Sequence, residues 1–194
     1  MNVRIKLIRS LRALALPAMM LALSLPVFAA NGAVRPGIGK NSPTVNQLVR
    51  EVRHQLLMLP YYGVFDNLEF RIVRNDRVVL TGEVVRPILK SAAASTVRSI
   101  PGVKRVVNHI KVLPVSFFDN QIRRAEYREI YRAPGFEQYA IRAVPPIHII
   151  VDNGDVTLVG VVADKMDKEI AGIRANEVRD VFHVSNDLRI SHNG

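Results

Sequence analysis

Residues 77–112 read RVVLTGEVVRPILKSAAASTVRSIPGVKRVVNHIKV, and this stretch decides the fold. Residues 78–85 are rich in valine, as β-strands are. Pro87 then opens an alanine-rich helix that we expect to reach Ile100, because proline favours the first helical position. A Pro-Gly pair turns the chain into a second strand, residues 103–112. The stretch predicts a strand, a helix and a strand in succession.

The same pattern returns 78 positions further on, where residues 155–190 read DVTLVGVVADKMDKEIAGIRANEVRDVFHVSNDLRI. The offset does not slip by one residue across strand, helix and strand. The matched pairs are Val78 and Val156, Leu80 and Leu158, Gly82 and Gly160, Val103 and Val181, Asn108 and Asn186, and Ile110 and Leu188. Two copies in register indicate a duplicated structural module.

Each copy also has a helix and a strand before the repeated stretch. In the first copy, Ser42 is the expected N-cap of a helix that starts with Pro43 and stops at Pro60. The strand 68–73 then forms a β-hairpin with 78–85. The apolar positions that we expect this helix and the helix 87–100 to bury are Val45, Leu48, Val49, Val52, Leu56, Leu59, Ile88, Ala92, Ala93, Thr96, Val97 and Ile100.

The second copy has the same element order. A helix over 117–132 is expected to turn Phe118, Ile122, Ala125 and Ile130 inward. Strands 147–152 and 156–162 flank Asn153-Gly154, a strong hairpin signal. Asp164 is the expected N-cap of a helix over 165–178. The order α-β-β-α-β occurs twice and predicts an α+β fold of two tandem units, each a three-stranded mixed sheet packed against two helices.

The two copies resemble the BON domain, a family named for bacterial osmotic-shock and nodulation proteins. The resemblance rests on the strand pattern V-x-L-x-G-x-V, on the alanine-rich helix and on the closing pattern G-V-x-x-V-x-N-x-I/L-x-V. The second copy departs from the closing pattern, because Asp180 stands at the position of Gly102. It implies domains at 44–114 and 115–191, and a likeness to osmotically inducible periplasmic proteins with two such domains. It also implies phospholipid binding and support of the envelope under stress.

Glycines inside strands cost stability, so Gly82 and Gly160 need a reason. We expect a bulge or a close approach of helix to sheet at both, with a structural role rather than ligand binding. Gly102 belongs with them as the turn residue of the shared motif.

The first 29 residues have the pattern of a cleavable signal peptide. Four cations without an acid precede an apolar run from Ala13 to Leu25, and small residues follow at Ala29 and Ala30. We expect cleavage after Ala29 or Ala30, a flexible linker over 30–43 and a periplasmic location. An uncleaved membrane anchor is the alternative. With no cysteine, the chain has neither disulfides nor the lipidated cysteine of a lipoprotein.

The whole chain carries a formal charge of +10, and the charge is uneven between the copies. Residues 44–114 hold eleven Lys or Arg against five Asp or Glu, whereas residues 115–194 hold ten against twelve. A basic first copy indicates a polyanionic partner.

No catalytic pattern stands out, so we expect neither enzymatic activity nor a cofactor or metal. None of the five histidines is paired at a metal-binding spacing, and no nucleophile motif or phosphate-binding loop is present. An exported protein does not meet nucleic acid, and RNA-binding signatures are missing. The polyanions left are anionic phospholipid and other envelope polymers.

The candidate lipid-binding residues combine clustered cations with nearby aromatics. They are Arg50, Arg53, Lys104, Arg105, Tyr61 and Tyr62. The alternative is a protein–protein adaptor or chaperone-like module that docks on an envelope complex. The oligomeric state is left open by the sequence.

Overall fold

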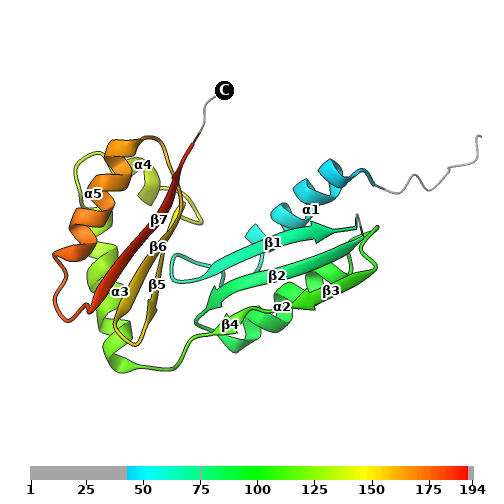
Figure 1. Cartoon of the computed structure of the whole chain (residues 1–194), viewed down its shortest axis with the longest axis horizontal. Coiled ribbons are helices and arrows are strands. Elements are labelled where there is room, and N and C mark those ends of the chain that lie inside the picture. Colours follow the sequence, from blue (N-terminus) through cyan, green and yellow to red (C-terminus); the bar gives the residue numbers. More distant parts are fainter. Residues whose placement is uncertain (1–42, 75, 192–194) are drawn as a thin grey trace, which may run out of the picture. The chain divides into compact units, whose positions relative to one another are not determined.

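The computed structural model describes residues 43–74 and 76–191 (Figure 1). The signal peptide expected over 1–29, the linker up to residue 42 and the proposed cap Ser42 lie outside the described residues. Within them, no helix combines the length and apolar character that crossing a bilayer demands.

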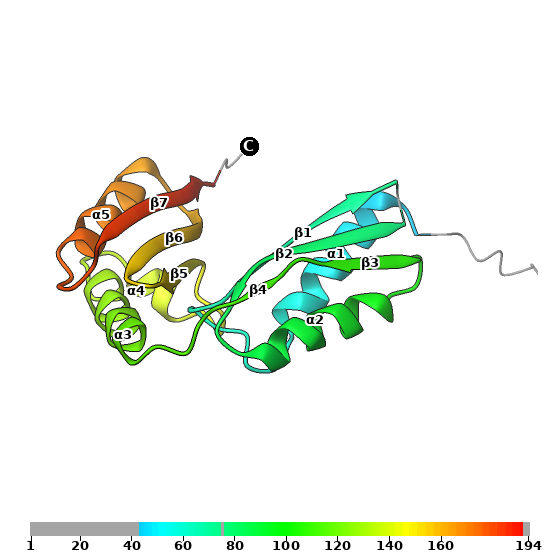
Figure 2. The same cartoon turned by 60° about the horizontal axis from the view of Figure 1, so that its bottom comes forward.

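The first copy has two helices on one face of a mixed sheet (Figures 1 and 2). Strand β2 is central: β1 pairs with it antiparallel, while β3 and β4 pair with it in parallel. The elements are α1 (Val45–Leu57), β1 (Asn67–Val73), β2 (Arg77–Val84), α2 (Pro87–Arg98), β3 (Arg105–Asn108) and β4 (Lys111–Val112). Leu48, Val52, Leu80 and Val97 are among the side chains that fill the core between helices and sheet.

The second copy repeats this arrangement, with β6 between antiparallel β5 and parallel β7. Its elements are α3 (Phe117–Tyr131), α4 (Glu137–Ala140), β5 (Ile147–Asp152), β6 (Asp155–Val162), α5 (Lys165–Asn176) and β7 (His183–Ile190). The α+β fold of two tandem units is therefore confirmed. The short helix α4 was not predicted; it lies between α3 and β5.

The shared asparagine ties the closing strand to the helix in both copies. Asn108 Nδ2 donates to the carbonyl oxygen of Lys90 at 2.9 Å, and Asn186 Nδ2 donates to that of Lys168 at 2.6 Å. Each asparagine also accepts from the backbone amide two residues later. The first copy has two strands, β3 and β4, where we had expected one strand over 103–112, whereas β7 of the second copy is continuous.

The strand glycines are required by the neighbouring strand and not by a helix. Gly82 and Gly160 have φ angles of +107° and +130°. An added Cβ would lie 2.2 Å from the carbonyl oxygen of Asn67 or 1.9 Å from that of Pro146. The expected close approach of a helix was wrong, because the nearest atoms belong to the backbone at the start of the neighbouring strand; the structural role of these glycines stays a prediction.

The closing turns need a left-handed residue in both copies. Gly102 has φ +95°, and an added Cβ there would meet the ring of Pro43. Asp180, which replaces it in the second copy, has φ +65°. Aspartate is one of the few residues other than glycine that tolerate this region, so the turn survives the replacement.

Three details of the helices differ from the sequence prediction. Helix α1 is capped by Thr44, which forms a capping box with Gln47. In α2, Ile88 is exposed and Leu89 is buried, because the inward face is set by Leu89, Ala93 and Val97. In α3, Phe118 is exposed, so its predicted inward position was wrong.

Candidate functional site

A groove lies in the second copy, between α3, the β5–β6 turn and the segment from α5 to β7. Its volume is about 1100 Å³. Helix α3 starts at this groove because Ser116 caps it, accepting a hydrogen bond from the amide of Asp119 at 3.1 Å. The first turn of the helix is therefore held beside the hairpin tip.

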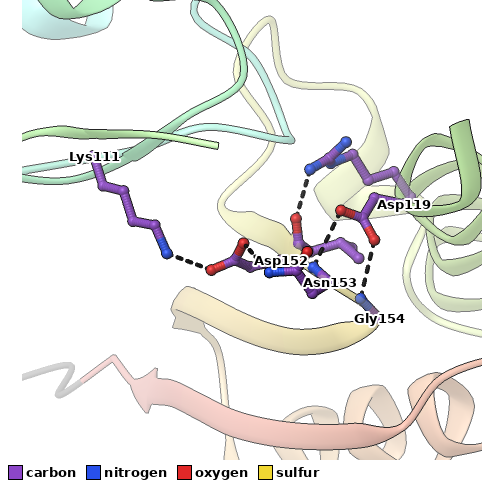
Figure 3. Close-up of polar contacts among 7 residues, drawn as sticks. Lys111, Asp119, Asp152, Asn153 and Gly154 are labelled. Carbon is purple, nitrogen blue, oxygen red and sulfur yellow. Dashed lines mark hydrogen bonds and ion pairs between the residues drawn. The ribbon is translucent and has the colours of Figure 1, made fainter. Parts of the chain in front are cut away.

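Asp119 fixes the β5–β6 turn that forms one wall of the groove (Figure 3). Its buried carboxylate accepts hydrogen bonds from the amides of Asn153 and Gly154, at 3.1 and 3.0 Å. Both turn residues have positive φ, as the Asn-Gly sequence predicts. At the same turn, Lys111 of β4 forms an ion pair with Asp152 (Figure 3).

Buried charges continue along the same side of α3. Arg123 donates to the carbonyl oxygen of Val151 and to the side chain of Asn120, and its burial lowers its pKa. Glu126 is fully buried, and neither carboxyl oxygen has a hydrogen-bond partner among the described residues. Desolvation, helped by the neighbouring Glu129, raises the pKa of Glu126 to about 8.

Three phenylalanines stand out from the surface around the groove. Phe117, Phe118 and Phe182 are 72%, 74% and 82% exposed. The last two line the groove, and Phe117 packs edge-on against Phe118. The ring of Phe182 lies over Gly154 so closely that an added Cβ there would be 2.7 Å from it.

Guanidinium groups accompany these rings. Arg124, Arg128 and Arg179 line the groove and are exposed. Within the described part of the chain, none of them has a carboxylate oxygen within 4.0 Å. Of the four acidic residues in the lining, Asp119 is engaged by the turn and Glu177 pairs with Arg174. Glu129 and Asp180 are exposed and form no ion pair among the described residues, so the groove combines exposed aromatic rings with unpaired charges of both signs.

The structure places the predicted site residues in several different environments. Arg50 and Arg53 are exposed on α1, and Arg105 is exposed at the start of β3. Lys104 forms an ion pair with Asp76 at 3.2 Å. Among the described residues, no ion pair joins the α1 pair to an acid near the Lys104-Arg105 pair, and Lys104 pairs only with Asp76.

The two tyrosines also differ. Tyr61 is exposed and receives the guanidinium of Arg86 over its ring at 4.9 Å. Tyr62 stacks on the buried His148, with ring centroids 5.5 Å apart. Burial lowers the pKa of His148. This histidine is thus a packed strand residue.

The sequence analysis missed Phe117 and Phe182. A signal for Phe182 was available, because it occupies the position of Lys104 in the other copy. The same exposed turn thus has a cation in one copy and an aromatic ring in the other. The burial of Asp119, Arg123 and Glu126 had no comparable signal.

In residues 43–74 and 76–191 there is no group of three or more histidine and acidic side chains arranged to hold a metal ion. The arrangement at the groove is suited to contact with an amphiphilic or macromolecular surface.

The model of the BON domain matches the chain twice, over residues 46–114 and 119–191. The chain belongs to the BON domain family. No curated protein matches it. Similar solved structures include two of CdsD, a structural protein of the type III secretion system of Chlamydia trachomatis. The structure of the C-terminal domain of CdsD is 14% identical in sequence, with a TM-score of 0.32. The match covers 74% of the present chain and 97% of the CdsD chain. The second CdsD structure is 13% identical in sequence, with a TM-score of 0.30. The match covers 75% of the present chain and 93% of the CdsD chain.

Loss of the Asp119 carboxylate should loosen the hairpin tip of the second BON domain. We expect Asp119→Ala to lower the free energy of unfolding by about 1–3 kcal/mol, because the buried amide of Gly154 loses its acceptor. Chemical denaturation measures this, and amide exchange at Gly154 should accelerate. Asp164→Ala, which removes an exposed N-cap, is the control and should cost about 1 kcal/mol. Unchanged exchange at Gly154 would show that Asp119 does not hold the turn.

Proposed function

We propose that this BON protein is a non-enzymatic module of the cell envelope that contacts anionic phospholipid surfaces and supports envelope integrity under osmotic stress. BON domains are in general envelope modules associated with phospholipid binding. The observation that carries the proposal for this chain is the set of exposed Phe117, Phe118 and Phe182 beside unpaired arginines. Aromatic rings lodge at the interface of a bilayer, and arginines attract its anionic headgroups.

The two BON domains have different parts in this contact. The first has the excess of cations, including Arg50, Arg53, Lys104 and Arg105, and supplies long-range attraction that salt screens. The second has a slight negative charge but exposes the phenylalanines, which supply short-range apolar contact. The signal-like N-terminus supports a periplasmic location.

Vesicle co-sedimentation, with anionic and zwitterionic lipid at two salt concentrations, tests this division. Changing Phe117 and Phe118 to Ser should weaken binding to anionic vesicles by about tenfold or more at both salt concentrations, since burial of one phenylalanine contributes about 1.5–3 kcal/mol. Changing Arg50, Arg53, Lys104 and Arg105 to Gln should instead weaken binding mainly at low salt.

The matched control is Ile88→Ser with Ile173→Ser. Both isoleucines are 59% exposed, and neither lines the groove. This double variant should bind as the unchanged protein does. Equal binding to anionic and zwitterionic vesicles, or no effect of the phenylalanine substitutions, would contradict the proposal.

A further inference from the structure

In the second BON domain, the loop residues Val64 and Phe65 cover the edge of the sheet. Strand β5 is at the edge, and its outward-facing amide at Ile149 donates to the carbonyl oxygen of Val64 at 2.8 Å. Val64 and Phe65 also pack against the core of this domain. Five successive residues of β5, Ile147–Val151, are buried. The edge of this sheet is thus closed by backbone pairing and by apolar contact.

The first domain has the same edge without such a cover. Phe70 of β1 pairs with Leu80, and Ile149 of β5 pairs with Leu158. Because Leu80 and Leu158 are equivalent positions of the repeat, Phe70 is the counterpart of Ile149. By this register, the amide of Phe70 faces outward from the sheet. In the described part of the chain, neither a strand nor a backbone hydrogen bond from outside the sheet meets it.

A groove of about 400 Å³ runs beside this free edge, between α1 and β1. Its apolar side chains are Val49, Leu56, Leu57, Leu68, Phe70 and Ile72. Its charged side chains are Arg53, Arg71 and Arg189 against one carboxylate, Glu69. No carboxylate oxygen of the described residues lies within 4.0 Å of any of the three guanidinium groups.

We propose that the free edge of β1 binds an extended acidic peptide segment of a partner protein as an added β-strand. An extended peptide pairs with the backbone of an edge strand and places alternate side chains on each face. A lipid chain fills an apolar groove but leaves the amide of Phe70 without an acceptor. The excess of arginine selects acidic residues and disfavours basic ones. The chain's own residues 31–40 contain Arg35 and Lys40 and no acid, so they do not match.

This docking surface goes beyond the lipid contact, and none of the three exposed phenylalanines lines its groove. The probe is a labelled synthetic peptide of about eight residues, a common strand length, that alternates Glu with Val. We expect saturable binding by fluorescence anisotropy, and slower amide exchange at Phe70 on addition of the peptide. A peptide with Lys in place of Glu should not bind. A peptide N-methylated on its alternate amides should not bind either, because methylation removes the strand-pairing donors while keeping the charge.

The variant Arg71→Gln with Arg189→Gln, which spares the cations assigned to the lipid contact, should weaken peptide binding by about tenfold or more, the effect of losing one charge-assisted contact. Arg50→Gln with Arg98→Gln is the matched control, since both arginines are exposed in the first domain but do not line the groove. Equal binding of the methylated peptide would overturn strand addition. If the unchanged protein does not bind the peptide and Arg71→Gln with Arg189→Gln loses vesicle binding, lipid is the occupant of the groove and the proposal is overturned. The phenylalanine variant should bind the peptide normally, so this test can fail or succeed independently of the lipid contact.

Discussion

Valine or alanine at position 160 should destabilise the second BON domain by about 2–6 kcal/mol. About 1–3 kcal/mol comes from forcing a side chain into a filled space, and about 1–3 kcal/mol from holding a residue other than glycine at positive φ. The added Cβ itself would lie 1.9 Å from the carbonyl oxygen of Pro146, at φ +130°. Alanine should therefore be nearly as damaging as valine. Denaturant unfolding followed by circular dichroism measures the loss.

Gly82→Ala should destabilise the first domain in the same way, because the added Cβ would lie 2.2 Å from the carbonyl oxygen of Asn67. Thr157→Val is the control, because it places a valine in the same strand β6 without adding a Cβ. It should leave the denaturation midpoint almost unchanged. If Gly160→Ala were tolerated and only valine were damaging, the constraint would come from a more distant neighbour such as a helix.

The stability of the second BON domain should fall as pH rises between about 5 and 8, because of Glu126. The folded state keeps the proton on this buried carboxyl up to its pKa of about 8, whereas the unfolded state releases it near the ordinary value of 4.5. Between these values the folded state holds one more proton, so its advantage is complete at low pH and declines by about 1.4 kcal/mol per pH unit. The expected loss between about pH 5 and 8 is on the order of 4 kcal/mol.

The variant Glu126→Gln lacks the titrating proton and should remove this part of the pH dependence. Glu126→Leu should raise stability at about pH 8, because it removes a buried polar group that has no partner. Glu137→Gln, at an exposed position, should keep the slope of the unchanged protein. Chemical denaturation at a series of pH values measures how the free energy of unfolding of each variant depends on pH. A slope shared by Glu126→Gln and the unchanged protein would show that this carboxyl is ionised in the folded state.

The local features of the fold could be predicted from the sequence. The alternation of apolar residues, the proline at the start of α2, the Asn-Gly turn and the Asp164 cap each act over a few residues, so a single chain displays them. The constant offset of 78 positions then showed that whatever the first copy forms, the second forms too. Even the two strand glycines were identified, because glycine inside a strand needs an explanation wherever it occurs.

The parts that depend on distant neighbours required the tertiary structure. Helical periodicity favoured Phe118 as a core residue, yet the structure buries Arg123 and Glu126 on α3 and exposes Phe118. The sheet that a helix packs against decides which helix face turns inward. Helix α3 packs against β5, where the carbonyl oxygen of Val151 accepts a hydrogen bond from Arg123. The amides of Asn153 and Gly154 in the following turn donate to Asp119. Hydrogen bonding and burial across such separations leave no periodic pattern in the sequence. For the same reason the groove, its exposed rings and the open edge of β1 became visible only in the folded chain.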